Sequence, residues 1–431
     1  MFAPFRSAPL STRLVVGGAL AIGLVERIGW ALARANGSAT GEAYNVAAAI
    51  GNGRGFADAF QIGQGATAHL MPLPPMVAGG VYATLGVGSK VAEAVLLGWA
   101  LLLTFATYAL FACVARRIGV GRKACVAGFA FLCVAPIFTT TEAFDFRAWE
   151  GGMTMSAAGL FLLLALRFDA SQKTEKRAMG RGAVALLAAL PALILFLQPM
   201  IGLAACVASI LLLWRRRDAV RPIDVAPFLI AFALLFGGWT ARNVAVMGAP
   251  IVLRDNLGLE LAVANHAGAV NPADPKAAFE ARLGTVHPYV STAAFDALRR
   301  AGGEIAYAKA LGAQTRAWMA AHPGDTARLW AGHLRQIVLP APWQFRTAHG
   351  RALPIVRAVL LDIVTVAGLI GLGLLLRDRD RRRRALYLAP FVLLPILLYV
   401  PFQPILRYIW LVYAPLGYCA AFALERLVRR Q

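Results

Sequence analysis

The chain has 431 residues, of which 59% are hydrophobic and 15% are charged, and its mean hydropathy is +0.63. These values exclude an ordinary soluble globular domain and predict a membrane protein. Lysine and arginine outnumber aspartate and glutamate by 43 to 22, which gives a formal net charge of +21. A charge of this size raises the question of nucleic-acid binding, and its distribution along the chain answers that question.

Arginine and lysine gather in five clusters, each at an end of a long apolar segment. The clusters lie at residues 116–123, 167–181, 215–221, 377–384 and 426–430. Basic residues concentrate in the cytoplasmic loops of membrane proteins, so this arrangement follows membrane topology and we predict no nucleic-acid partner. All five clusters share the cytoplasmic side if both termini are cytoplasmic. The first apolar segment lacks a small-residue cleavage site and is expected to be a retained signal anchor.

Ten apolar segments are candidate spans, judged against the roughly 20 residues that cross a bilayer. They are 13–33, 91–114, 124–139, 151–167, 183–197, 200–214, 225–241, 354–376, 385–401 and 406–424. The pair 183–197 and 200–214 is split only by Gln198 and Pro199, so it forms either two crossings or one broken element. Two crossings keep every basic cluster inside. We therefore expect an all-α polytopic membrane protein with about ten transmembrane helices.

Two long segments remain on the outer side, residues 34–90 and 242–353. The second carries amphipathic patches and no 20-residue apolar run, so it is predicted to be a small extracytoplasmic domain. The expected organisation is an N-terminal transmembrane module (1–241) that contains the first loop (34–90), an insert (242–353) and C-terminal transmembrane helices (354–431). No repeat at a fixed period is present, which gives no support to a repeat-built transporter.

The first outer loop carries a single acid near the membrane. Glu42 is the only acidic residue between Arg27 and Asp58. The apolar residues that follow it recur at helical spacing, which predicts a helix lying along the membrane surface. A carboxylate held there can accept a proton from an attacking hydroxyl or amine; the alternative is a solvated acid favoured by the helix dipole. Further along the loop, His69 is a lone histidine, more typical of a hydrogen-bonded loop residue than of a ligand.

A second polar group lies before the span at 151–167. Glu142, Asp145 and Glu150 surround Arg147 at the predicted membrane boundary, where charges are costly unless they are paired or face a wet cavity. These residues form either a polar site or an ordinary interfacial loop anchored by Trp149.

Two arginines occupy the outer ends of spans. Arg242 ends the segment 225–241, and Arg407 opens the segment 406–424. A guanidinium group binds two phosphate oxygens at once, which suits a lipid-linked phosphate. For Arg407, snorkelling to lipid headgroups is the alternative.

Six short motifs follow one another along the chain. They are Gly41-Glu42…Tyr44…Ala47 with Gly53-Arg54-Gly55-Phe56; Thr67-Ala68 with Pro72, Pro74 and Pro75; Trp239-Thr240-Ala241-Arg242-Asn243; Asn256-Leu257-Gly258-Leu259-Glu260 with Asn265; Gly303-Glu304-Ile305 with Trp318 and His322-Pro323; and Arg407-Tyr408. In this order they resemble the motifs of the bacterial GT-C glycosyltransferases, the group that includes protein O-mannosyltransferases and aminoarabinose transferases (glycosyltransferase family 39-like). The resemblance covers most of the chain.

The resemblance implies a GT-C-like bundle with an extracytoplasmic insert in the bacterial inner membrane, and an active site that faces the periplasm. It also implies a polyprenyl-phosphate-linked sugar as donor and a lipid, glycan or protein as acceptor. The acid that activates the acceptor carries over only onto Glu42, and the donor phosphate falls to Arg242 and Arg407. Candidate substrate contacts in or beside these motifs are Tyr44, Arg54, His69, Asn243, Asn265 and Tyr408.

One departure from the group concerns the acid itself. The group commonly has aspartate there, often beside a second acid, whereas Thr40 and Gly41 precede a lone glutamate in this chain. The missing second acid argues against a bound divalent metal, and no cofactor is expected. The second-acid role seen in some members falls here to Asp145 or Glu150, with Glu142 as a further candidate.

The sequence therefore predicts an inverting hexosyl or pentosyl transferase with Glu42 as base. Three alternatives remain. A lipid-linked sugar flippase or transporter would distribute charged residues through its membrane spans. A non-catalytic membrane assembly protein would give Glu42 no catalytic role. An enzyme of the O-antigen ligase type would need an outer loop rich in arginine and histidine. The sequence determines neither the sugar nor the acceptor.

Overall fold

The structure of the protein is a computed structural model that describes residues 9–33, 41–171, 179–219, 221–345 and 352–429. The predicted loops begin or end in residues 34–40 and 346–351, which lie outside these ranges, as do residues 172–178 of the cluster 167–181. Among the described residues the regular secondary structure is helical, and no strand forms beyond an isolated bridge between Ala57 and Ala66.

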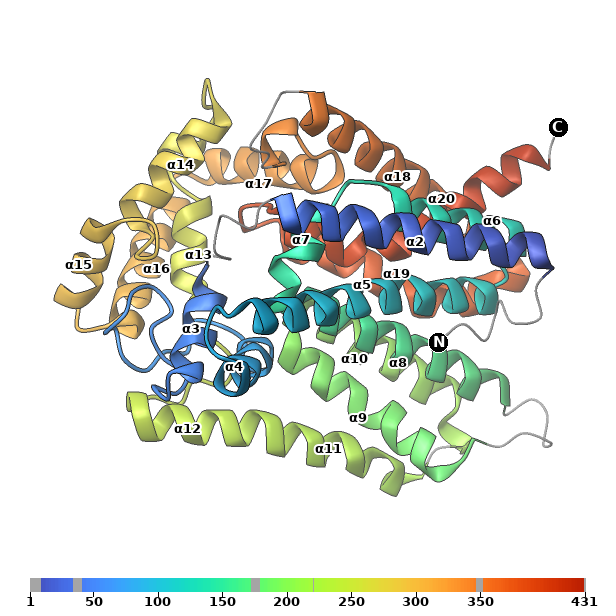
Figure 1. Ribbon diagram of the computed structural model, residues 1–431, viewed down its shortest axis with the longest axis horizontal. Coiled ribbons are helices and arrows are strands. Elements are labelled where there is room, and N and C mark those ends of the chain that lie inside the picture. Colours follow the sequence, from blue (N-terminus) through green and yellow to red (C-terminus); the bar gives the residue numbers. More distant parts are fainter. Residues whose placement is uncertain (1–8, 34–40, 172–178, 220, 346–351, 430–431) are drawn as a thin grey trace.

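Long helices run side by side along the molecule and short helices gather at one end of it (Figure 1). The long helices of the bundle are α2 (Leu10–Ala33), α5 (Lys90–Ile118), α6 (Arg122–Val134), α8 (Gly151–Ser171), α9 (Arg181–Leu197), α10 (Pro199–Arg215), α11 (Ala226–Phe232) continued by α12 (Gly238–Met247), α18 (Ala352–Arg377), α19 (Arg379–Leu398) and α20 (Leu406–Val428). The shorter helices are α3 (Glu42–Gly51), α4 (Leu73–Leu85), α7 (Thr139–Ala143), α13 (Leu257–Ala264), α14 (Pro275–Val286), α15 (Thr292–Arg300), α16 (Glu304–Ala321) and α17 (Pro323–Val338).

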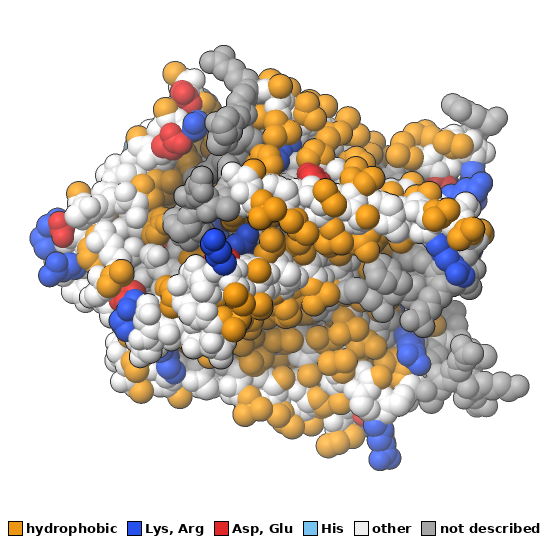
Figure 2. Space-filling view, in the orientation of Figure 1, with side chains coloured by type: hydrophobic (Ala, Val, Ile, Leu, Met, Phe, Trp, Pro, Cys, Tyr) orange, Lys and Arg blue, Asp and Glu red, His pale blue; other side chains and the backbone are white. Residues whose placement is uncertain are grey.

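Helix covers all or most of each of the ten predicted spans. Within the described ranges, six helices are long and apolar enough to cross a membrane, and a seventh span forms if α6 and the segment Thr139–Arg147, bent by 75°, count together. The other predicted segments are weaker because α9 and α10 have only 17 residues each, about 26 Å at 1.5 Å per residue, and α19 begins with several arginines. The protein is therefore an all-α, multi-pass membrane protein. Hydrophobic side chains cover the middle of the face shown in Figure 2.

The segment 183–214 forms two helices rather than one broken helix. The chain turns at Gln198, whose side-chain oxygen accepts a hydrogen bond from the Met200 amide at the start of α10. Helices α9 and α10 then pack against each other. A side chain at Gly202 would collide with Leu195 at 2.2 Å, so the glycine permits this close contact. The two helices pack against each other as a hairpin, and the two crossings of the membrane stay a prediction.

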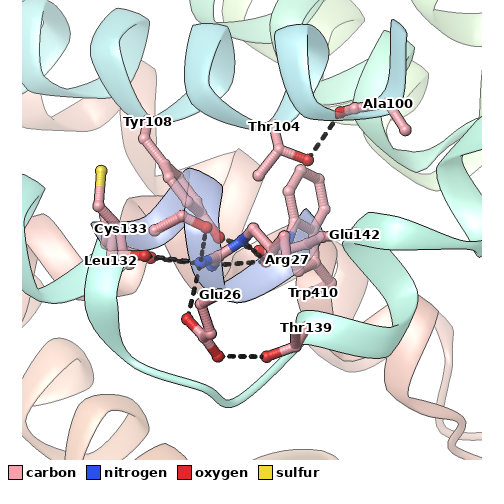
Figure 3. A network of polar contacts seen from close by, with 11 residues as sticks. Glu26, Arg27, Ala100, Thr104, Tyr108, Leu132, Cys133, Thr139, Glu142 and Trp410 are labelled. Carbon is pink, nitrogen blue, oxygen red and sulfur yellow. Dashed lines mark hydrogen bonds and ion pairs between the residues drawn. The ribbon is translucent and has the colours of Figure 1, made fainter. Parts of the chain in front are cut away.

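A buried ion pair joins helices of the bundle (Figure 3). Arg27 of α2 donates to Glu142 of α7 at 2.7 and 2.6 Å, and it also donates to the carbonyl of Cys133. Tyr108 and Trp410 donate to the other oxygen of the same carboxylate. A buried charge in a membrane must be paired in this way. Glu142, a candidate second acid, therefore acts as the centre of a structural network.

The insert helices form their own small core with the first loop. Phe60 from the loop packs with Leu259, Val286, Phe295 and Tyr307 of the insert. Helices α3 and α4 pack on each other beside this core. The two segments predicted to lie outside the membrane thus gather at the same end of the bundle (Figure 1).

The contact between α13 and α16 depends on a glycine. A methyl group at Gly258 would lie 1.8 Å from the carbonyl oxygen of Ala308. We expect Gly258→Ala to destabilise the protein by about 1–3 kcal/mol, as overpacking does, and to lower the midpoint of thermal unfolding. Gly284→Ala in α14, where no atom lies within 4 Å, is the control and is expected to be neutral or mildly stabilising. Equal midpoints for Gly258→Ala and wild type would contradict this packing.

Candidate functional site

Glu42 opens α3, a helix that is buried by other parts of the protein. Ala43, Val46, Ala47 and Ala49 are completely buried, because α4 packs along one side of α3 and the loop 56–70 joins the same core. The prediction of a helix was correct, and its placement along the membrane surface stays a prediction. The Glu42 carboxylate is itself only 9% exposed, so it is held by the protein rather than by water.

Two histidines contact the same oxygen of that carboxylate. The Nε2 atom of His69 lies 3.3 Å from Oε1 of Glu42, and the Nε2 atom of His287 lies 3.2 Å from it. His69 comes from the first loop and His287 ends α14 of the insert. The Phe60 ring packs against both imidazoles, with centroids 4.5 and 5.9 Å away. The site therefore forms where loop and insert meet.

These neighbours keep Glu42 ionised. Burial by itself would raise its pKa, but the hydrogen bond with His69, the charges of His287 and His69, and Arg407 together lower the pKa to about 2. For His69, burial opposes protonation, but Glu42, Asp255 and Glu304 raise its pKa. For His287, burial lowers the pKa despite the nearby Glu42. The ionised Glu42 therefore lies between two histidines of opposite tendency: the pKa of His69 is raised, and the pKa of His287 is lowered.

Glu304 fastens the insert onto the loop that carries His69. Its carboxylate accepts hydrogen bonds from the side chains of Gln64 (2.6 Å) and Thr67 (2.7 Å) and from the amide of Ala68 (2.6 Å). Burial and the neighbouring Asp255 raise the pKa of Glu304 to about 8. The family resemblance placed this residue in the helical tail of the insert; its contact with the first loop is a feature of the fold.

This raised pKa predicts a stability that falls as pH rises. Between the ordinary value of 4.5 and about 8, Glu304 keeps a proton in the folded state that the unfolded chain has lost. The free energy of unfolding therefore decreases with pH across this window. We expect the midpoint of thermal unfolding of the wild type to drop by several degrees as the pH is raised from 4.5 to about 8.

The fall of the thermal midpoint with pH should be smaller in Glu304→Gln, because glutamine has no proton to lose. Glu280→Gln alters a half-exposed acid of α14 and is expected to keep the wild-type slope. A wild-type midpoint that rises with pH across the window would contradict the assignment to Glu304.

Arg407 of α20 interacts electrostatically with Glu42 from the bundle side of the site. Its guanidinium carbon lies 3.8 Å from the centre of the Trp149 ring. Glu42, Asp145 and Glu150 all interact with its charge. Its Nε atom is buried without a hydrogen-bond partner. The structure thus brings Arg407 and the two remaining second-acid candidates into one neighbourhood.

A second arginine, Arg254, lies near residues that also interact with Arg407. Arg254, which lies just before α13, interacts electrostatically with Tyr408, Glu260 and Glu150. Tyr408 and Glu150 are also neighbours of Arg407. Neither guanidinium donates a hydrogen bond to any residue in the described part of the chain. The sequence places Arg254 in the polar cluster that follows the seventh predicted span, where guanidinium groups suit a lipid-linked phosphate, but it assigns the donor phosphate to Arg242 and Arg407. The fold brings Arg254 near Tyr408 of α20.

Other predicted residues hold the frame around the site. Tyr44 donates to the carbonyl of Phe144 at 2.6 Å, which joins α3 to the segment that carries Asp145. Arg242 donates to the carbonyls of Thr67 (2.7 Å) and Phe56 (2.5 Å), so it clamps the first loop. Its Nη1 and Nη2 atoms are engaged in these contacts.

The remaining predicted contacts are tied to backbone or to loop residues. Asn243 donates to the carbonyl of Ile251 at 2.8 Å. Asn265 donates to the carbonyl of Pro401 at 2.8 Å and so connects the insert to the turn before α20. Arg54 pairs with Asp58 at 2.8 Å on a half-exposed loop. Tyr408 stacks on Tyr399, with ring centroids 4.4 Å apart.

Solved structures of one archaeal enzyme share this fold. The apo oligosaccharyltransferase of Archaeoglobus fulgidus superposes with a TM-score of 0.55 at 15% identity, over 99% of this chain and 51% of that one. The oligosaccharyltransferase AglB of the same organism, in complex with an inhibitory peptide and a dolichol-phosphate, gives a TM-score of 0.50 at 16% identity, over 98% and 51%. The chain therefore shares the helical fold of the matched part of these enzymes.

The likeness concerns the fold, because the identity is low and the chain spans about half the length of those proteins. No protein-family model matches the sequence, and no curated protein matches it. Within this fold, the residues of this chain that gather at the junction of loop, insert and bundle are Glu42, His69, His287, Arg254, Arg407 and Glu150.

Proposed function

We propose that the protein is a membrane glycosyltransferase that moves a sugar from a polyprenyl-phosphate donor to an acceptor on the periplasmic side of a bacterial inner membrane. The observation that carries this proposal is the placement of Glu42, a buried and ionised carboxylate that interacts with the charge of Arg407. The acceptor is a lipid, a glycan or a protein, and the sugar is a hexose or a pentose. The fold shared with the oligosaccharyltransferases supports the reaction class.

The donor phosphate lies against the arginines in this mechanism. Arg407 and Arg254 have donors that are not used by described residues, and both lie near the end of the bundle. Their charge stabilises the phosphate as the bond between it and the anomeric carbon breaks. Exposed apolar side chains such as Leu229 (60%) and Leu234 (72%) on the helix 222–247 face membrane lipids, the phase from which a polyprenyl chain approaches. Arg242 supports the loop rather than the phosphate.

Glu42 takes the acceptor proton. The acceptor oxygen or nitrogen forms its bond to the anomeric carbon on the face opposite the phosphate, so one displacement inverts that centre. Both histidines contact Oε1, which leaves Oε2 for the proton. A carboxylate with a pKa of about 2 is a weak base, but the acceptor becomes strongly acidic once the new bond forms. A late proton transfer therefore suffices.

Donor consumption tests the proposal. Purified protein in liposomes that contain a polyprenyl-phosphate sugar and an acceptor extract should release polyprenyl phosphate and form a glycosylated product. A flippase would move the donor across the bilayer without consuming it, and a non-catalytic assembly protein would do neither. Intact donor in every condition would contradict the proposed transfer.

A further inference from the structure

The Glu42 cluster contains more nitrogen ligands than a general base requires. A single hydrogen bond would orient the carboxylate, yet both His69 and His287 direct Nε2 at one oxygen atom, at 3.3 and 3.2 Å. One ligand atom from each of the three residues lies within 4.8 Å of the others. The two rings are perpendicular, with an interplanar angle of 89°. Three donor atoms therefore converge from the first loop, α3 and the insert.

The two nitrogen–oxygen separations match the edges of a metal polyhedron. Zinc binds histidine nitrogen and carboxylate oxygen at about 2.0–2.1 Å in tetrahedral sites, which places neighbouring ligand atoms about 3.3 Å apart by the geometry of the tetrahedron. Both measured nitrogen–oxygen distances agree with that edge. Two histidines and one glutamate are also a ligand set that leaves a fourth position open for water or substrate.

The surroundings hold the ligands in place and balance an added charge. The carbonyl of His287 accepts hydrogen bonds from the amides of Val290 and Ser291 at 2.9 and 3.1 Å, which fixes the end of α14. Glu304 fixes the loop before His69. Further carboxylates interact with the imidazoles from the insert, Asp255 and Glu304 with His69 and Glu260 with His287. Because folded Glu304 keeps its proton up to about pH 8, Asp255 and Glu260 are the acids of this group that can offset Arg407, which otherwise opposes a cation.

The sequence argued against a divalent metal because Glu42 has no second acid beside it, but the fold supplies two histidines in place of that acid. We propose that Glu42, His69 and His287 form a binding site for one divalent transition-metal ion of the zinc class. Nitrogen-rich sites of this kind prefer zinc-type ions over magnesium and calcium, which favour oxygen ligands. A bound ion supplies Lewis acidity at its open position. The site shares Glu42 with the proposed transferase, but metal binding is measured without any transfer reaction.

Metal content tests the site directly. Protein stripped with a chelator and then incubated with Zn²⁺ should bind about one ion per chain by elemental analysis. With Co²⁺ as the probe, the absorption spectrum should show the intense visible bands of tetrahedral coordination. Glu42→Gln, His69→Gln and His287→Gln should each weaken binding on the order of 100-fold or more. His322→Gln, on an exposed histidine that stacks on Trp318, should bind like the wild type.

Two outcomes would overturn the inference. One is a wild-type protein that folds, as judged by its thermal unfolding, and binds neither ion at micromolar concentration. The other is a double variant His69→Gln/His287→Gln that retains the wild-type stoichiometry and cobalt spectrum. Because neither readout depends on sugar transfer, an inactive protein that binds the metal refutes only the proposed function. A protein that transfers sugar but binds neither Zn²⁺ nor Co²⁺ refutes only the metal site.

Discussion

Replacing Glu42 with glutamine is expected to lower the rate of sugar transfer by about 10²–10⁴-fold, the contribution of a positioned general base. Glutamine keeps the size and one oxygen of the side chain but cannot accept the proton. Donor affinity should change little, because the phosphate lies against arginines rather than against this carboxylate. The measurement is single-turnover transfer at saturating donor, with donor binding followed separately by fluorescence of a labelled lipid.

The matched control is Glu280→Gln, which changes a half-exposed glutamate of the insert and should leave the rate unaltered. Aspartate at position 42 tests the reach of the base, since it keeps the charge and shortens the side chain by one methylene. We expect intermediate activity for Glu42→Asp. Normal transfer by Glu42→Gln protein that folds and binds donor would remove Glu42 from the chemistry and direct attention to Asp145 or Glu150.

Loss of the converging arginines should have the second largest effect. For Arg407→Ala we expect kcat/KM to fall by about 10²–10³-fold, the cost of removing a charge-stabilising donor from an active site. Arg254→Ala should resemble it, because the two residues share Tyr408 and Glu150 as neighbours. Lysine should restore only part of the activity at either position, since it lacks the planar fork that binds two phosphate oxygens.

Inhibition by free polyprenyl phosphate provides the second readout for these variants. If the arginines bind the phosphate, the inhibition constant should rise in both alanine variants in parallel with the loss of kcat/KM. Arg300→Ala, on an exposed arginine at the end of α15, is the control. An unchanged inhibition constant in Arg407→Ala and Arg254→Ala would place the phosphate elsewhere.

The membrane character of the fold was predictable because long apolar runs and basic clusters are local properties of a chain. Helix formed at each of the ten segments, and the fold class was correct. The number of convincing spans was smaller, six or seven in the described ranges, because 17-residue helices and an arginine-rich helix start fall short of the length and apolarity of a full span. The sequence pattern cannot tell how such segments sit in the bilayer.

Glu42, His69, Arg407 and Glu150 of the candidate site were named from the sequence as separate candidates, but the sequence did not predict that they gather in one place. Glu42 stood out because it is the only acid in its stretch of loop. His287 did not, because its partner His69 lies far away in the sequence and neither residue has a ligand at close spacing. Arg242 lies in a motif that resembles the family, but its side chain binds the carbonyls of Phe56 and Thr67. A contact of this kind depends on the fold and leaves no pattern in the chain.

The most direct test of the account uses sided membrane vesicles. A panel of radiolabelled polyprenyl-phosphate sugars is supplied to right-side-out and inverted vesicles that carry the protein, and donor consumption is measured. We predict that one donor is consumed with transfer of its label to an acceptor, and only where the outer face is accessible. Label that crosses the membrane on intact lipid, or no consumption of any donor in the panel, would contradict a transferase with an outward-facing site.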